Sequence, residues 1–214
     1  MDKRVIIVGA GGHGQVVADA LLQMAQHGAA LAPAGFVDDD AALVGTHFLD
    51  LPVLGQIASL AAFDHDAVII AIGNNQVRRA IFTTLQAQGE SFATVIHPRA
   101  IVAPSARIGA GAVIVAGAIV NPGAVIGANV ILNTGATVDH HNQIGSHAHI
   151  APGAHLGGDV VIGEGTLVGI GAIVMPQCCV GAWSVIGAGA VVTHNQPGAI
   201  VAIGVPARIV RSRS

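Results

Sequence analysis

A strict six-residue period dominates the second half of the chain. Sixteen consecutive six-residue units run from Ala100 to Asn195, and the third residue of every unit is valine, isoleucine or leucine. A period of six fits neither the 3.6-residue repeat of a helix nor the two-residue alternation of a strand. It is typical of a β-solenoid in which three units form one triangular coil and the aliphatic residues point inward. These aliphatic residues are Val102, Ile108, Ile114, Val120, Ile126, Leu132, Val138, Ile144, Ile150, Leu156, Ile162, Val168, Val174, Val180, Ile186 and Val192.

The composition indicates what such a solenoid exposes. Hydrophobic residues make up 52% of the chain and charged residues 10%, so a slim prism would present wide apolar faces, which usually mark an interface. We therefore expect an oligomer. No apolar run reaches the roughly 18–20 residues of a membrane-spanning helix, so we expect a cytoplasmic protein without a membrane partner. A net charge of −3 and 3% aromatic residues argue against nucleic-acid binding.

The first 97 residues have a different pattern, in which expected strands and helices alternate. Strands are expected at 5–8, 35–38, 67–72 and 92–96, helices at 15–26 and 76–88, and a connector at 51–57. Such alternation predicts a parallel sheet with helical crossovers. His97-Pro98 marks a boundary, because the residue before proline favours extended geometry. We thus predict a small Rossmann-like domain over 1–97 and a solenoid domain over 98–214, with an irregular tail after Asn195.

A glycine-rich loop follows the first expected strand. Residues 9–14 read Gly-Ala-Gly-Gly-His-Gly, a pattern that lets backbone N–H groups and a helix N-terminus approach a phosphate. Asp38 and Asp39 follow about 25 residues later, at the end of the next strand. About 95 residues are too few for a complete dinucleotide fold, so a mononucleotide or sugar nucleotide fits better. A tight turn without a ligand is the alternative.

Five histidines fall within one and a half coils: His140, His141, His147, His149 and His155. In a triangular coil, the first two share a corner, the third lies at the next corner, and His149 begins the third face. Because these places are about 15–20 Å apart, the five side chains cannot share one metal ion, and we expect no metal. If prisms pack side by side, His140 of one chain can face His149 of its neighbour. An imidazole there suits a general base, with Asp139 or His141 orienting it.

Six motifs along the whole chain resemble those of the bacterial nucleotide-aminosugar N-acetyltransferases of the hexapeptide-repeat family. That family includes bacillosamine-type UDP-4-amino-sugar acetyltransferases and proteins labelled sialic acid O-acetyltransferases. The motifs are Gly-Ala-Gly-Gly-His-Gly (9–14), Phe-Val-Asp-Asp (36–39), Ala-Ile-Gly-Asn-Asn-Gln-Val-Arg (71–78), Asn-Thr-Gly-Ala-Thr-Val-Asp-His-His (133–141), His-Ile-Ala-Pro-Gly-Ala (149–154) and Gly-Val-Pro-Ala-Arg (204–208).

The resemblance implies a left-handed parallel β-helix, a homotrimer with its active site between subunits, and acetyl-CoA as the acetyl donor. The implied acceptor is the amine of a nucleotide-linked 4-amino-4,6-dideoxy sugar, with UDP favoured. His140 would be the base, His149 would lie near the thioester, and Gly158 would donate its N–H near the acetyl group. Ile170 and Ala188 would follow the pantetheine arm. The implied nucleotide-binding residues are Gly11, His13, Asp38, Asp39, Gly73, Asn74 and Arg78.

One position departs from the family pattern. Relatives often carry Asp or Glu directly after the catalytic histidine, whereas this chain has His141. A carboxylate that orients His140 would then be Asp139 or come from elsewhere. Three other functions stay open: sugar or sialic acid O-acetylation, a non-catalytic nucleotide-binding trimer, and a metal-dependent solenoid of the carbonic-anhydrase kind.

Overall fold

A computed structural model describes residues 2–213 of the chain. The contacts divide these residues into two compact units, one ending at Pro98 and the other beginning at Arg99. The division lies one residue from the expected domain boundary. Positions 1 and 214, which the expected domains include, lie outside the described residues.

The first unit is built on a five-stranded sheet with the order β3-β4-β2-β1-β5. Strand β1 lies between β2 and β5, and its residues Val5–Val8 are completely buried, as their apolar sequence predicts. All neighbouring strands run parallel except β3 and β4, which are antiparallel. The strands are β1 (Lys3–Val8), β2 (Leu31–Val37), β3 (His47–Phe48), β4 (Leu51–Gly55) and β5 (Ala67–Ile70).

The expected connector at 51–57 is wrong, because most of it forms strand β4 in the sheet. Val53 is buried there and pairs with Phe36 of β2. Pro52 argues against a strand in the sequence, since proline cannot donate to a ladder. The strand tolerates it because the ladder with β2 begins one residue later, where Phe36 pairs with Val53, and because it is Val53 whose N–H donates toward β3, to the Thr46 carbonyl at 2.8 Å. Gly35 makes the pairing fit, since a Cβ there would lie 2.7 Å from the Pro52 carbonyl oxygen.

Both expected helices are present in the first unit. Helix α1 spans Gly12–Gln26 and starts three residues before the expected position, directly in the glycine loop. Helix α2 spans Asn75–Ala87, and the Asn74 side chain caps it by accepting two backbone N–H bonds. The remaining elements are the 3-10 helices η1 (Ala41–Leu43) and η2 (Ile57–Ala62) and the strand β6 (Val95–Ile96). Within residues 2–213, no helix is both long and apolar enough to cross a membrane.

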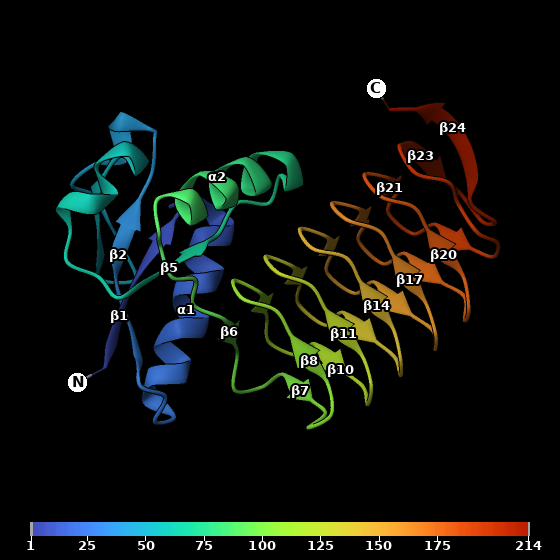
Figure 1. Cartoon of the computed structure of the whole chain (residues 1–214), viewed down its shortest axis with the longest axis horizontal. Coiled ribbons are helices and arrows are strands. Elements are labelled where there is room, and N and C mark those ends of the chain that lie inside the picture. Colours follow the sequence, from blue (N-terminus) through green and yellow to red (C-terminus); the bar gives the residue numbers. More distant parts are fainter. Residues whose placement is uncertain (1, 214) are drawn as a thin grey trace. The chain divides into compact units, whose positions relative to one another are not determined.

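The second unit is the expected parallel β-helix, whose coils stack in chain order (Figure 1). Within residues 2–213 each six-residue unit contributes a two-residue strand, and the second residue of each strand is the aliphatic one that the period predicts. The strands are β7 (Ile101–Val102), β8 (Arg107–Ile108), β9 (Val113–Ile114), β10 (Ile119–Val120), β11 (Val125–Ile126), β12 (Ile131–Leu132), β13 (Thr137–Val138), β14 (Gln143–Ile144), β15 (His149–Ile150), β16 (His155–Leu156), β17 (Val161–Ile162), β18 (Leu167–Val168), β19 (Ile173–Val174), β20 (Cys179–Val180), β21 (Val185–Ile186) and β22 (Val191–Val192).

Three parallel sheets form the faces of the prism. We call the sheet of β7, β10, β13, β16, β19 and β22 the first face, that of β8, β11, β14, β17 and β20 the second, and that of β9, β12, β15, β18 and β21 the third. Paired residues are 18 apart, as in Thr137 and His155, so each residue lies above the one 18 positions earlier. The corner between the first and second faces therefore holds the turns at 121–123, 139–141 and 157–159, and we call it the catalytic corner because the residues that the sequence predicts for catalysis fall on it. The corner between the third and first faces, the distal corner below, holds those at 151–153, 169–171 and 187–189.

The tail after Asn195 is not irregular throughout, as the sequence predicts, because about half of it forms strands. Residues after the last coil form β23 (Ile200–Ile203), which pairs parallel to β21, and β24 (Arg208–Ser212), which pairs antiparallel to β23. The period of six ends there, but the alternation of buried Ile200 and Ala202 with more exposed neighbours is that of an ordinary strand. Gly204, at φ +91, lies in the connecting turn.

Candidate functional site

The catalytic corner brings together most of the residues that the sequence predicts for catalysis. Asp139, His140 and His141 form the turn after β13, and Gly158 and Asp159 lie in the turn one coil further on. The Asp159 N–H donates to the His140 carbonyl at 3.0 Å, which ties the two turns together.

The two imidazoles at this corner face each other. The Nδ1 atoms of His140 and His141 are 3.1 Å apart, and the rings meet edge to face with their centroids 5.3 Å apart. Asp159 Oδ2 lies 4.0 Å from His140 Nδ1, with about half of each of these two side chains exposed. The catalytic corner thus holds a solvent-accessible imidazole with a second imidazole and a carboxylate beside the same ring nitrogen.

Glycines above and below leave the space that the two rings occupy. A Cβ on Gly158 would lie 2.4 Å from both Cε1 and Nε2 of His140. A Cβ on Gly123, in the coil on the other side, would lie 2.6 Å from His141 Cδ2. Any side chain at these two positions would displace an imidazole, so the glycines fix where the rings lie.

The Asp139 side chain stabilises the turn through hydrogen bonds to groups other than the His140 ring. Its Oδ1 accepts the backbone N–H of His140 at 2.7 Å and the Asn121 side-chain amide at 2.8 Å. The first bond and then the second lower the pKa of the Asp139 carboxyl. Among the described residues, the carboxylate that lies 4.0 Å from the ring nitrogen is Asp159, and a role of Asp139 in orienting the imidazole stays a prediction. Sequence reasoning missed Asp159, although the 18-residue coil spacing from His141 points to it.

The residues predicted to bind the cofactor divide between two places on the prism. Gly158 lies beside His140, whereas Ile170 and Ala188 lie exposed at the distal corner. His149 lies on the third face, where its Nε2 is 3.1 Å from the Asn133 side-chain amide nitrogen, a partner that sequence reasoning did not single out. One chain therefore does not bring His140 together with His149, Ile170 and Ala188.

Three side chains of the catalytic corner could also approach one cation. Donor atoms of His140, His141 and Asp159 all lie within 4.8 Å of one another. His147 lies at the next corner, as the coil geometry predicts, and His155 lies on the first face. The absence of a bound metal stays a prediction, which metal analysis of the purified protein tests.

The other sequence-predicted residues gather at one edge of the first unit's sheet. The chain runs from β1 to β2 on one side, and β5 pairs with β1 on the other, so the strand order reverses between β1 and β5. Open α/β sheets bind ligands at the carboxyl ends of strands at such a switch point. Gly11 follows β1 and Gly73 follows β5, and added Cβ atoms at both would meet nothing within 4 Å. The backbone at both positions is therefore open to a ligand.

In the glycine loop, some glycines allow close packing and others leave the backbone accessible. Gly9 has φ +107, a conformation that favours glycine, and a Cβ on Gly14 would lie 2.1 Å from the Gly9 carbonyl oxygen. Gly14 thus lets helix α1 pack closely against the loop. Gly11 is the N-cap of α1 and supplies no side-chain cap, so the first turn of the helix is available to an anion.

Arg78 lies completely buried beneath this edge. Its Nη1 donates to the carbonyls of Ile72 at 2.9 Å and Gly73 at 3.4 Å, which fixes the loop after β5. Burial lowers the pKa of Arg78 to about 10, so it remains charged at pH 7. Burial, and then the Arg78 charge, lower the pKa of His13 to about 4, so His13 is neutral at pH 7.

The two acidic residues after β2 brace the neighbouring loops. Asp38 Oδ2 accepts the Ala10 N–H of the glycine loop at 2.7 Å, and its Oδ1 accepts the Asp40 N–H at 2.9 Å. The exposed Asp39 accepts the Ile57 N–H at 3.1 Å. The structure therefore gives Asp38 a direct part in shaping the glycine loop, beyond the ligand contact that the sequence predicts.

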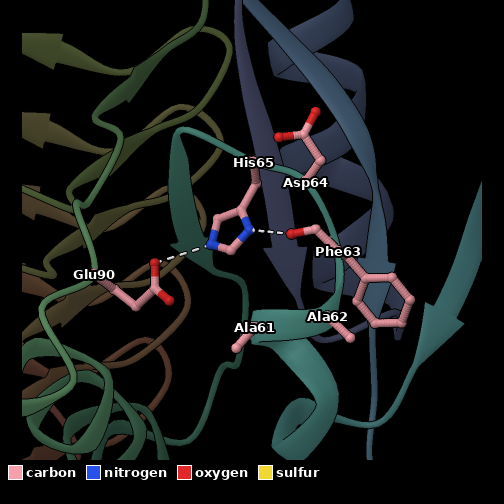
Figure 2. Close-up of a pocket in the computed structure, with 6 residues that line it drawn as sticks. All are labelled: Ala61, Ala62, Phe63, Asp64, His65 and Glu90. Carbon is pink, nitrogen blue, oxygen red and sulfur yellow. Dashed lines mark hydrogen bonds and ion pairs between the residues drawn. The ribbon is translucent and has the colours of Figure 1, made fainter.

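An open depression of about 550 Å³ lies elsewhere on the first unit, lined by Ala61, Ala62, Phe63, Asp64, His65 and Glu90. Figure 2 shows His65 between the Phe63 backbone and the Glu90 side chain, at 2.7 Å from the Phe63 carbonyl oxygen and 2.9 Å from Glu90 Oε2. Both ring nitrogens are thus engaged within the protein. We interpret this cluster as a clamp between the end of η2 and the segment after α2.

Two domain families match the two units. Residues 4–85 match the PglD N-terminal domain, and residues 159–194 match the bacterial transferase hexapeptide of six repeats. A curated relative, the UDP-N-acetylbacillosamine N-acetyltransferase of Bacillus subtilis, is 42% identical over 112 residues. That match covers 51% of this chain, and the chain spans half the length of this relative.

Solved structures match nearly the whole chain. The acetyltransferase domain of PglB from Neisseria gonorrhoeae, in complex with acetyl coenzyme A, is 37% identical with a TM-score of 0.91, over 98% of this chain and 100% of that one. PerB from Caulobacter crescentus, in complex with CoA and GDP-perosamine, is 37% identical with a TM-score of 0.89, over 97% of both chains. The chain therefore belongs to the family of hexapeptide-repeat N-acetyltransferases that carry a PglD-type N-terminal domain and a left-handed β-helix.

Proposed function

We propose that this protein transfers the acetyl group of acetyl-CoA to the amine of a nucleotide-linked 4-amino-4,6-dideoxy sugar, with a UDP-sugar favoured. The observation that carries the proposal is the His140 imidazole, exposed and seated against Gly158. The likeness to PglB with acetyl coenzyme A and to PerB with CoA and GDP-perosamine supports both substrates.

The reaction needs one base and one oxyanion donor. The neutral amine attacks the thioester carbonyl carbon, a C–N bond forms, and the C–S bond breaks. His140 Nε2 takes the proton from the attacking nitrogen and returns it to the departing thiolate, so that the amide and the free thiol of CoA result. Within residues 2–213 the Gly158 N–H donates to no other group, which leaves it available to the carbonyl oxygen as negative charge develops.

We propose that the active site forms between chains of a homotrimer. His140 and Gly158 lie at the catalytic corner, whereas Ile170 and Ala188 lie at the distal corner of the same prism. A neighbouring prism that places its distal corner against the catalytic corner would supply the pantetheine contacts and bring its His149 toward the thioester. The exposed Ile170, at 62%, and Ile173, at 40%, are apolar surface suited to such packing. A reaction of these two substrates fits the cytoplasm.

We propose that the first unit holds the nucleotide at the switch point between β1 and β5. The open N-terminus of α1 beside Gly11 suits the phosphates, and the buried charge of Arg78 strengthens this preference for an anion. The neutral His13, Gly73 and Asn74 would contact the rest of the nucleotide, and Asp39 a ribose hydroxyl. We expect the protein to bind its substrates without a metal.

The direct test is His140→Ala. We expect the turnover number to fall by roughly 10²–10⁴, the usual contribution of a general base, while calorimetry shows unchanged sugar-nucleotide binding. An unchanged rate would contradict the role of His140. A panel of UDP-, GDP- and dTDP-linked 4-amino sugars and matched hydroxyl acceptors, compared by kcat/KM, identifies the acceptor. A preference for a hydroxyl would contradict N-acetylation.

A further inference from the structure

The catalytic corner contains two side chains that take no direct part in the proposed proton transfer. His141 follows the base directly in the chain, and Asp159 lies one coil away, 18 residues after His141. Both side chains are exposed, and both approach His140 Nδ1. His141 Nδ1 lies 3.1 Å from this atom, and Asp159 Oδ2 lies 4.0 Å from it.

The contact between the two imidazoles restricts their tautomers. Two Nδ1 atoms 3.1 Å apart form a hydrogen bond only if one carries a proton and the other a lone pair. A base that works through Nε2 must carry its own proton on Nδ1. His140 is then the donor in this contact and His141 the acceptor, so His141 carries its proton on Nε2.

The fold holds His141 in this accepting position. Its backbone has φ +58, and its N–H donates to the Pro122 carbonyl at 3.1 Å. The absent side chain of Gly123 provides the space for its ring. These contacts come from the coil before His141, so the acceptor is positioned independently of any substrate.

Asp159 acts at longer range. At 4.0 Å from His140 Nδ1 its Oδ2 is too far for a hydrogen bond but close enough for a Coulomb interaction with the ring. The charged or titratable groups around His140 on this corner are Asp139, His141 and Asp159. Asp139 directs its hydrogen bonds to the backbone of His140 and to Asn121, so Asp159 is the carboxylate that faces the ring.

We propose that His141 and Asp159 are positioning residues for His140: His141 fixes the tautomer that leaves Nε2 free, and Asp159 stabilises the imidazolium formed during proton transfer. They would together replace a single carboxylate next to the base in the chain. This inference rests on the proposed role of His140 as the base.

Steady-state kinetics on the full chain, with EDTA present, separate this role from a structural one. Asparagine at position 141 offers Oδ1 near the place of Nδ1, so His141→Asn should stay within about threefold of the wild-type kcat. His141→Phe removes the acceptor and should lower kcat about tenfold, with both KM values unchanged. Asp159→Asn should lower kcat about threefold to fivefold. The matched control is Glu164→Gln, which removes a carboxylate from another corner and should change nothing.

Histidine-selective ¹⁵N NMR tests the tautomer without relying on activity. We expect the protonated nitrogen of neutral His140 to be Nδ1 in the wild type, and a mixture of tautomers in His141→Phe. A wild-type ring protonated on Nε2, or wild-type kcat in both His141→Phe and Asp159→Asn, would overturn the inference. If His140→Ala is fully active, the proposed function fails instead, whatever the tautomer. Circular dichroism and calorimetric nucleotide binding show whether each variant is folded.

Discussion

At the scale of single residues, Gly158 is the most sensitive position next to the base. Its φ lies outside the left-handed region, so alanine is compatible with the backbone, but the new Cβ would lie 2.4 Å from His140 Cε1 and Nε2. The imidazole must then move by about 1 Å or more. Since misplacement of this size costs about 10²-fold in rate, we expect Gly158→Ala to lower kcat by about that factor.

A double-variant cycle distinguishes a displaced base from a general disturbance. If Gly158→Ala acts by moving the imidazole, adding it to His140→Ala should cause little further loss. Fully additive losses would show that Gly158 acts mainly in another way, for example through its N–H.

Sequence reasoning singled out His140 and His141 because they belong to a recognisable motif, and Gly158 because it lies one coil above His140. The repeat geometry correctly separated His147 and His149 from this corner. Sequence reasoning missed Asp159 and Asn133 because their partners, His140 and His149, lie 19 and 16 residues away, in neighbouring coils. It gave Asp39 and Asp38 the same role, although the two carboxylates brace different loops. Hydrogen bonds between coils and loops depend on side-chain directions that a single sequence does not specify.

At the scale of elements, the clamp at His65 makes the stability of the first unit depend on pH. Although partial burial opposes the charged form, hydrogen bonds to the Phe63 carbonyl and the Glu90 carboxylate raise the pKa of His65. A pKa raised by folding gives stability that is fully present below the unfolded value near 6.5 and is lost as pH rises through the folded value.

We therefore expect His65→Gln to lower the thermal midpoint most near pH 6, by a few degrees, and progressively less toward pH 8. Thermal unfolding of both proteins across this range measures the difference, and Glu90→Gln should show the same trend. A difference that grows with pH would contradict the ion pair.

Strands could be predicted from the sequence wherever the six-residue period continued without a break. The repeat predicts the aliphatic core of the β-helix: the predicted residue is buried in every unit from Ile114 onward, and Val102 and Ile108 of the first two units are half-buried. Strand β4 and the hairpin of β23 and β24 did not follow. The sequence of β4 contains Pro52, and the hairpin begins after the six-residue period has ended. Their pairing with β2 and β21 is decided by tertiary contacts rather than by local pattern.

At the scale of the whole molecule, the separation of the two corners predicts complementation between inactive chains. His140→Ala should lack the base, and Ala188→Trp should block the pantetheine arm. In trimers reassembled from equal amounts of the two variants, each interface between neighbouring chains has about a one-in-four chance of receiving an intact catalytic corner and an intact distal corner. We expect about a quarter of the wild-type activity to return.

The measurement is the acetylation rate after mixed refolding, with each variant refolded alone as the control. Sedimentation should show a particle of three times the 21.3 kDa chain mass. If the mixture stays inactive while trimers form, the active site lies within one chain, and the proposed active site between neighbouring chains is wrong.

The stacking of residues 18 positions apart also restricts how the length of this chain can change. Inserting or deleting six residues between the turns at 139–141 and 157–159 would rotate everything that follows by about a third of a turn. Another residue pair would then lie over the base, and Gly158 and Asp159 would move to a different corner. Within the β-helix, gain or loss of a complete coil outside this interval keeps both the stacking over the base and the order of the three faces, so viable length variants of the β-helix should differ by multiples of eighteen residues.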